Sequence, residues 1–76
     1  MHLDIITPDK VLYSGEVNAV QLPGAKGSFE VLNNHAALIS NLEGGKIRVK
    51  DAEGTHFIEV TGGIVEVLKN TIIVLT

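Results

Sequence analysis

Turn signals interrupt this chain every few residues, and their spacing strongly constrains its fold. Glycine, proline, asparagine and aspartate favour turns because they allow positive φ, fix φ, or hydrogen-bond to their own backbone. The signals stand at Pro8-Asp9, Ser14-Gly15, Pro23 to Gly27, Asn33-Asn34, Gly44-Gly45, Asp51 to Gly54, Gly62-Gly63 and Lys69-Asn70. No segment between them shows a helical period. Short segments separated by turns at intervals of about 8–12 residues are typical of an all-β sandwich or barrel.

The segments between the turns are rich in Val, Ile and Thr, as β-strands are. Residues 46–50 (KIRVK) alternate strictly between basic and apolar side chains, which predicts a half-buried strand. Residues 72–75 (IIVL) are apolar at both phases, which predicts an inner strand or one covered by a partner. Between Ala19 and Val20 the apolar positions change phase, and a β-bulge would explain this slip.

The composition predicts one domain, residues 1–76, with apolar surface that its own core does not bury. A chain this short buries only about 60% of the surface that its unfolded form exposes. Yet 45% of its residues are hydrophobic, and its mean hydropathy is +0.28. Cysteine is absent, so neither a disulfide nor a thiolate metal site is available. Exposed apolar patches mark partner surfaces, although scattered exposed Val and Ile are also normal in proteins.

Charge and hydropathy exclude several classes of partner. The formal net charge is −3, and the six basic residues are dispersed along the chain, which argues against a nucleic-acid surface. A basic N-terminal region followed by an apolar stretch, as in a signal peptide, is not seen. No apolar run approaches the ~20 residues of a membrane-spanning helix. Any association with a membrane is therefore expected to go through another protein.

The residues offer little support for an active site. Two glycine-lysine segments, 24–28 (GAKGS) and 44–46 (GGK), do not match the phosphate-binding pattern G-x-x-x-x-G-K-[ST]. His2, His35 and His56 lack the paired spacing of metal ligands. No serine stands in a nucleophile-elbow sequence. We therefore expect a non-catalytic protein that holds no cofactor and no metal.

The most distinctive stretch is residues 21–42, QLPGAKGSFEVLNNHAALISNL. Further motifs follow at 45–49 (GKIRV), 60–67 (VTGGIVEV) and 71–75 (TIIVL), and the chain starts with HLDIITP at 2–8. In this order the motifs resemble the β-sandwich domain of the epsilon subunit of the rotary, F-type ATP synthase. That family reads roughly P-G-x-x-G-x-F/L-x-I/V-L-x-N/G-H-A-P-L in the region of the distinctive stretch. The resemblance covers essentially the whole chain, although Asn33 and Ala37 replace two common prolines.

This resemblance implies a flattened two-sheet β-sandwich of about ten short, mostly antiparallel strands. It implies a non-catalytic rotor subunit in the central stalk, which binds the gamma subunit and the ring of c subunits and couples ion translocation to ATP synthesis. The expected location is peripheral, at the cytoplasmic face of the bacterial inner membrane. Many epsilon subunits continue into a two-helix C-terminal domain. Because these 76 residues end after the last expected strand, we expect a short form without that helical domain.

The resemblance also implies two partner surfaces. The positions that match the gamma-binding face of the family are Thr7, His35, Leu38, Ser40 and Leu42. The positions that match the loop facing the c ring are Ala25, Lys26, Gly27 and Ser28. Leu38, Ser40 and Leu42 share one phase of a strand, so their side chains are expected to point to the same side. A second interpretation of His35, compatible with the first, is a turn histidine whose ring bonds to nearby backbone.

A different class of function remains open, namely a stand-alone β-barrel that binds a small ligand or a peptide. Such a protein would need a concave pocket with a few convergent polar groups. With two Phe, one Tyr and no Trp, the chain is poorly equipped to stack on sugars or bases.

Overall fold

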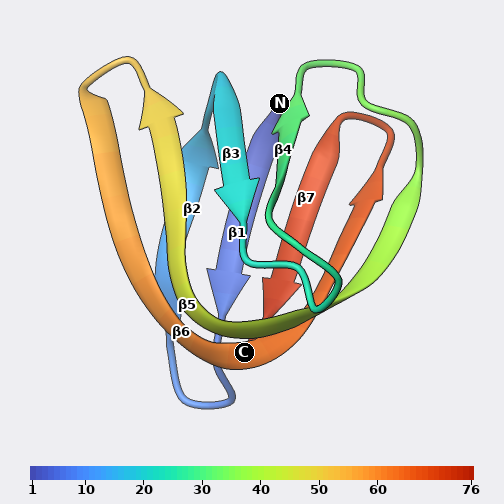
Figure 1. Ribbon diagram of the computed structural model, residues 1–76. Coiled ribbons are helices and arrows are strands. Elements are labelled where there is room, and N and C mark those ends of the chain that lie inside the picture. The colour runs from blue at the N-terminus through green and yellow to red at the C-terminus, as the bar shows by residue number, and fades with distance from the viewer.

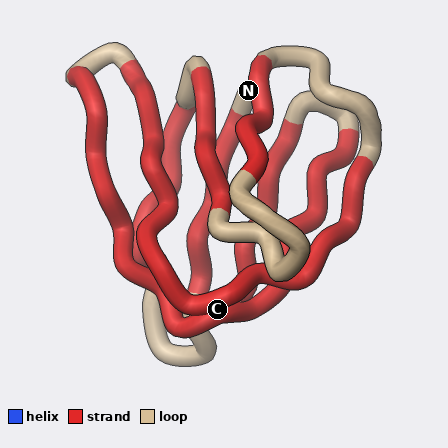
Figure 2. Tube along the Cα trace, viewed as in Figure 1, coloured by secondary structure: helices blue, strands red, loops and turns tan.

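Seven β-strands and no helix make up the computed structural model, which describes all 76 residues (Figures 1 and 2). The strands are β1 (His2–Ile6), β2 (Val11–Glu16), β3 (Ala19–Leu22), β4 (Phe29–Leu32), β5 (Leu38–Asp51), β6 (Gly54–Leu68) and β7 (Thr71–Leu75). The all-β prediction is confirmed. No segment of the structure is a helix of the length and apolarity that crossing a membrane requires.

The strands form one continuous hydrogen-bonded sheet in the order β2-β1-β7-β6-β5-β3-β4. All neighbours are antiparallel except β1 and β7, which run parallel. The expected count of about ten strands is too high. β5 and β6 are 14 and 15 residues long and pair along their whole length, so each counts once although it serves two layers.

The sandwich arises because β5 and β6 bend together, as the curved pair of strands in Figure 1 shows. One layer contains β4, β3, the second half of β5 and the first half of β6. The other contains the remaining halves with β7, β1 and β2. Gly62 and Gly63 have φ of 126° and 135°, a backbone region that favours glycine. The sequence signal predicts a turn at these two glycines. In the structure they bend β6, and its pairing with β5 continues through them.

The core lies between the two layers and contains no buried polar residue. The side chains with no exposed surface come from both layers: Leu3, Ile5, Val20, Leu22, Val31, Ile47, Val49, Val65, Ile72 and Val74. Residues 46–50 behave as their alternation predicts, with the two apolar side chains inside. β7 is an inner strand of the sheet, as its two apolar phases indicate.

The predicted bulge between Ala19 and Val20 is wrong. β3 pairs in unbroken register with β4, and the change of phase comes from the connection between β2 and β3. There Val17 is buried and donates its N–H to Met1 O at 2.9 Å, while Asn18 donates to Lys50 O at 2.7 Å. The chain thus leaves one layer and enters the other, which resets the side-chain alternation.

Candidate partner-docking surfaces

Leu38, Ser40 and Leu42 do point to one side of β5, but that side faces the interior of the sandwich. Leu42 belongs to the core and is only 6% exposed, and Leu38 packs against the core. Ser40 is half-buried, and its hydroxyl donates to the carbonyl oxygen of Asn41 at 3.2 Å. The outward side chains of this part of β5 are Ile39, which is 67% exposed, and Asn41.

Thr7 and His35 lie at opposite ends of the sandwich, in the β1–β2 turn and the β4–β5 loop (Figure 1). Thr7 organises its turn, because its Oγ1 accepts the N–H of Asp9 at 3.2 Å and of Lys10 at 3.0 Å. His35 donates its N–H to Leu32 O at 3.2 Å, and its Nδ1 lies 2.7 Å from Ala36 O. The contacts of His35 match the interpretation of a turn histidine.

The loop Ala25–Ser28 is exposed at all four positions and is fixed at its base. Gly27 donates its N–H to Gly24 O at 3.0 Å and has a φ of 127°. Gly24 is buried, and a Cβ there would lie 2.5 Å from Gly27 O and 2.9 Å from the ring of Phe29. The close packing of Gly24 and the positive φ of Gly27 therefore both require glycine.

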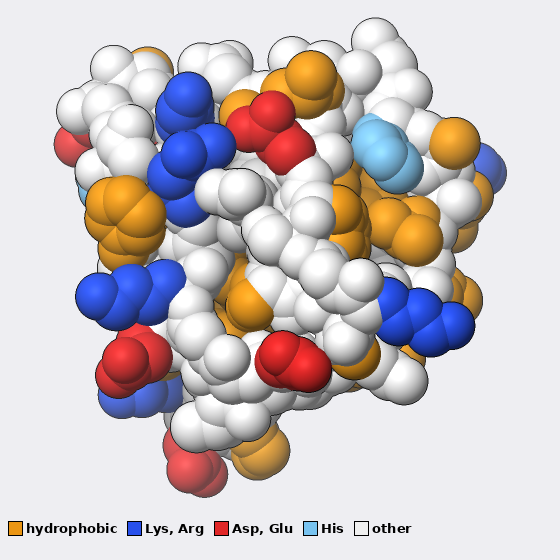
Figure 3. All heavy atoms as spheres, in the orientation of Figure 1, with side chains coloured by type: hydrophobic (Ala, Val, Ile, Leu, Met, Phe, Trp, Pro, Cys, Tyr) orange, Lys and Arg blue, Asp and Glu red, His pale blue; other side chains and the backbone are white.

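The structure brings this loop next to the first half of β5. Ala25 donates its N–H to Asn41 O at 3.0 Å, and Glu43 donates to Pro23 O at 2.8 Å. A depression of about 330 Å³ lies between the loop and the strand. It is lined by Gly24, Ala25, Lys26, Gly27, Phe29, Ile39, Ser40 and Asn41. The two predicted partner surfaces therefore adjoin each other here, and Figure 3 shows apolar side chains on the corresponding right side of the molecule.

The outer face of the layer that contains β7 carries a second apolar group of side chains. A depression of about 290 Å³ is lined by Ile39, Ile64, Glu66, Ile73 and Leu75. Strand register explains the grouping, because Glu66 stands opposite both Ile39 and Ile73, and Leu75 stands opposite Ile64. Residues 72–75 are apolar on both sides of their strand, and this is the sequence feature that indicates the surface.

The outer face of the other layer is basic along β5. Lys46, Arg48 and Lys50, half of the six basic residues of the chain, project from alternate positions of this strand. In Figure 3 basic side chains gather at the left, over β5 and β6. Arg48 pairs with Glu30 at 3.3 Å, so part of this charge is balanced. The strict alternation of residues 46–50 is the sequence feature that indicates this basic face.

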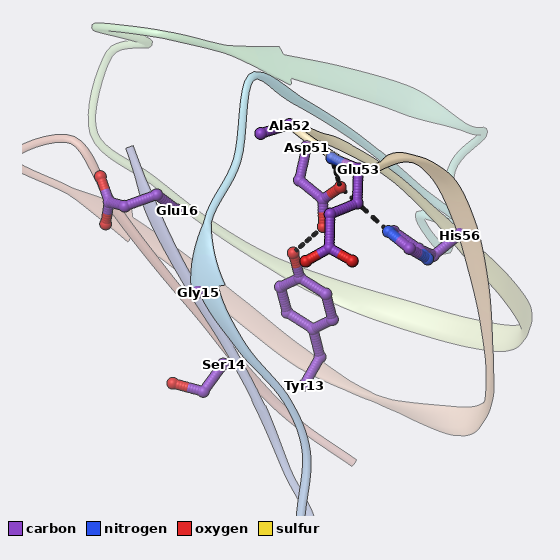
Figure 4. Close-up of a pocket in the computed structure, with 8 residues that line it drawn as sticks. All are labelled: Tyr13, Ser14, Gly15, Glu16, Asp51, Ala52, Glu53 and His56. Atoms are coloured by element: carbon purple, nitrogen blue, oxygen red, sulfur yellow. Dashed lines mark hydrogen bonds and ion pairs between the residues drawn. The ribbon is translucent and has the colours of Figure 1, made fainter.

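A hydrogen-bonded cluster joins the layers at the opposite side of the sandwich from the loop Ala25–Ser28 (Figure 4). Asp51 accepts from Tyr13 Oη at 2.6 Å, from the N–H of Glu53 at 2.9 Å and from His56 Nε2 at 2.9 Å. The hydrogen bond from Tyr13 is the main cause that lowers the pKa of Asp51 to about 2. Burial, aided by the nearby carboxylate, raises the pKa of Tyr13 to about 12. Because the carboxylate is occupied by three donors, this cluster acts as a structural link between β2 and the β5–β6 hairpin.

A smaller polar cluster lies on the outer face of β1. His2 lies 3.0 Å from Asp4 Oδ1 and 3.1 Å from Glu16 Oε2, and the Ser14 hydroxyl donates to Asp4 at 2.6 Å. The hydrogen bonds with Asp4 and then Glu16 raise the pKa of His2, while the bond from Ser14 chiefly lowers that of Asp4. These contacts satisfy one another at an exposed surface, and no group of three or more His, Cys, Asp or Glu side chains is arranged to hold a metal ion.

Comparison with known families decides what kind of domain this is. The family model described as "ATP synthase, Delta/Epsilon chain, beta-sandwich domain" matches residues 1–76. The chain belongs to this family. Its resemblance to epsilon subunits, visible in the sequence motifs, is therefore confirmed over the whole chain.

Curated relatives of this family are ATP synthase epsilon chains from bacteria. The one from Leptospira borgpetersenii is 40% identical over 76 residues, which are all of this chain and 60% of the relative. The one from Chlorobaculum tepidum is 43% identical over 75 residues, which are 97% of this chain and 85% of the relative. The chain thus spans less than two thirds of the first relative's length and most of the second.

Two solved structures share the fold. A chain in the Euglena gracilis mitochondrial ATP synthase structure, OSCP/F1/c-ring, aligns over 97% of this chain and 48% of its own length, with a TM-score of 0.89 at 21% identity. A chain in the central stalk/c-ring structure of the Tetrahymena thermophila mitochondrial ATP synthase gives a TM-score of 0.82 at 18% identity, over 97% and 60% of the two chains. At these identities the match shows a shared fold alone.

Proposed function

We propose that this chain is a non-catalytic rotor subunit in the central stalk of an F-type ATP synthase. The observation that carries the proposal is the match of all 76 residues to the delta/epsilon β-sandwich family. The names of the bacterial relatives and the central-stalk structure that shares the fold support it. In this role the subunit holds the gamma shaft to the c ring, so that ion translocation and ATP synthesis are coupled through rotation.

The gamma-binding surface in this proposal is the side of the sandwich formed by β5 and the β4–β5 loop. It contains His35 and the stretch of β5 with Leu38, Ser40 and Leu42, whose side chains face inward, so gamma meets the backbone and the outward side chains of this stretch. Thr7, the fifth proposed position, lies at the other end of the sandwich. The adjoining loop, Ala25–Ser28, meets the polar loops of the c subunits. Lys26 offers a cation and Ser28 a hydroxyl at an exposed tip whose base is held by backbone bonds. Two adjacent contacts on one stiff body suit a part that transmits torque.

The subunit is proposed to sit at the cytoplasmic face of the bacterial inner membrane, attached only through the complex. The bacterial origin of the relatives supports this location. The alternative of a ligand-binding barrel has less support. The sheet is not closed, because β2 and β4 end the strand order without pairing with each other.

Affinity capture from detergent-solubilised membranes of the source organism tests the proposal. The tag belongs at the C-terminus, since the amino group of Met1 donates to Asn33 Oδ1 at 2.9 Å. We expect gamma, the c ring and the catalytic alpha and beta subunits to be recovered together. An unrelated tagged β-sandwich of similar size is the control bait. Recovery of no ATP synthase subunit by the folded chain would refute the proposed function.

A further inference from the structure

The first half of β5 has a hydrogen-bonding partner on only one side. β6 pairs with it throughout, whereas β3 pairs only with its end, at residues 48–50. On the open side a single bridge joins Gly24 to Leu42. Toward the start of β5, residues 38–41 form a free strand edge, which we name the β5 edge.

The unused backbone groups of the β5 edge point away from β6. Glu43 donates its N–H to Pro23, and Asn41 O accepts from Ala25, so both residues direct their backbone groups to the open side. In an antiparallel ladder the N–H and C=O of one residue point the same way, and alternate residues agree. The N–H and C=O of Ile39 and the N–H of Asn41 therefore also face the open side. No hydrogen bond from a loop or a side chain reaches them.

Space for another chain lies on the open side of β5, beside Ile39. The depression of about 330 Å³ beside the loop Ala25–Ser28 ends at residues 39–41. A second depression, of about 340 Å³, is lined by residues 37–39 and 66–68, so it lies over the paired strands β5 and β6 and not on the open side. Ile39 itself is 67% exposed. A strand added at the usual spacing of about 4.8 Å would lie along the first of these hollows.

Several of the devices that protect free strand edges are missing at this one. Natural edges are blocked by proline, charged side chains, bulges or a covering loop. Residues 38–42 read LISNL, without proline or charge, and their pairing with β6 has no register shift. The loop Ala25–Ser28 covers the strand only as far as Asn41.

We infer that the β5 edge binds an extended segment of the gamma subunit as an added β-strand, through the backbone of Ile39 and Asn41. The inference rests on the proposed function for the identity of the partner, and on the direction of these N–H and C=O groups for the form of the contact. Strand addition gives affinity through main-chain hydrogen bonds, which a helix cannot supply because its own groups are bonded internally.

This mode of binding also accounts for the orientation of β5. The side chains of Leu38 and Leu42 face the core and are not free to anchor a partner. The backbone edge is what the strand presents to gamma. The gamma residue opposite Ile39 is expected to be apolar, because neighbouring side chains on one face of a sheet pack against each other.

Removal of one N–H tests the inference. The Ile39→Pro variant loses the outward donor but no bond to β6, and proline is tolerated on an edge strand when its nitrogen faces outward. We expect its affinity for purified gamma of the same organism to fall about tenfold or more, as for loss of a buried hydrogen bond with steric obstruction. The matched control, Ile39→Ala, keeps the N–H and is expected to bind within about threefold of the parent, as a peripheral side chain does.

Two further measurements keep the test decisive if Ile39→Pro does not fold. A synthetic chain with N-methyl-Ile39 lacks the same N–H donor but has no proline ring. Its affinity for gamma should fall by the same factor as that of Ile39→Pro. Amide hydrogen exchange of the parent should be fast at Ile39 and Asn41 but slow at Ser40 and Leu42. With gamma bound, Ile39 and Asn41 should become slow as well.

The outcomes separate the two proposals. If the folded parent does not bind gamma, both the proposed function and the inference fall. If the parent binds gamma but folded N-methyl-Ile39 binds equally well, only the strand-addition inference falls. Weaker binding of N-methyl-Ile39 with new protection at Ile39 and Asn41 supports it.

Discussion

The hydroxyl of Tyr13 donates a hydrogen bond of 2.6 Å to Oδ2 of Asp51, which lies 38 positions away in the sequence. Tyr13 is on β2, at one end of the strand order, and Asp51 ends β5 beside the β5–β6 hairpin. β2 is bonded to a neighbouring strand only on its β1 side. The Tyr13–Asp51 bond, with His56 on the same carboxylate, therefore ties the open edge of one layer to the hairpin of the other (Figure 4).

This link predicts acid sensitivity. Asp51 has a folded pKa of about 2, below the value of about 3.9 for an unfolded aspartate. The carboxylate therefore contributes stability above pH ~4, and the contribution is lost as pH falls toward ~2. We expect Asp51→Asn to be less stable than the parent at neutral pH and to lose less stability on acidification. Urea unfolding at several pH values between ~2 and ~6 measures this.

The same link predicts a separate effect in alkali. The folded pKa of Tyr13 is about 12, above the value of about 10 for an unfolded tyrosine. The unfolded state then loses its proton first, so stability is lost as pH rises from ~10 to ~12. Tyr13→Phe, which cannot ionise, should unfold over that range with a weaker dependence on pH. Equal pH slopes for parent and Tyr13→Phe would show that the hydroxyl is not buried against Asp51.

Leu42→Ala should act on stability first. Leu42 is 6% exposed in the core, and truncation of a buried leucine typically costs about 2–5 kcal/mol. Ile39, three residues earlier, is 67% exposed, and Ile39→Ala should change the free energy of unfolding by only about 0.5 kcal/mol. Urea unfolding of the two variants compares them directly. A stable, parent-like Leu42→Ala would mean that the inner side of β5 is accessible to a partner.

Gly24→Ala should be destabilising although it adds only a methyl group. The new Cβ would lie 2.5 Å from Gly27 O, and overpacking of this kind costs about 1–3 kcal/mol. The matched control is Gly15→Ala on β2, where the nearest atom would be the Tyr13 hydroxyl oxygen at 3.6 Å. Thermal unfolding should rank Gly24→Ala well below Gly15→Ala. If the two midpoints coincide, the loop Ala25–Ser28 is not held as described.

The sequence predicts the fold class and the individual strands better than it predicts their connection. Alternation in residues 46–50 correctly gives a strand with Ile47 and Val49 inside. The pairs Gly44-Gly45 and Gly62-Gly63 correctly mark special backbone geometry, but the chain bends there without reversing. A glycine signal reports the φ that a position needs, and the same signal serves a turn and a bend within a strand.

The candidate surfaces, too, could be predicted only in part from the sequence. The shared phase of Leu38, Ser40 and Leu42 is correct, but alternation gives a period and not a direction. Only the opposing layer decides that this phase faces inward. The exposed apolar and basic faces depend in the same way on which strands become neighbours, since Glu66 meets Ile39 and Ile73 only through pairing of β6 with β5 and β7.

The contact with the c ring should be specific to the loop Ala25–Ser28. Lys26 is exposed, and an exposed charge pair is worth only about 0–1 kcal/mol, so Lys26→Glu should weaken coupling modestly and leave gamma binding intact. Ser28→Cys supplies a positional test, because the chain has no other cysteine. In the assembled ATP synthase, Cys-substituted polar loops of the c subunit should form a disulfide with Ser28→Cys. Thr55→Cys, on the exposed start of β6, should not react with them. Equal crosslinking from both positions, or none from Ser28→Cys while gamma is bound, would remove the ring contact from the proposed function.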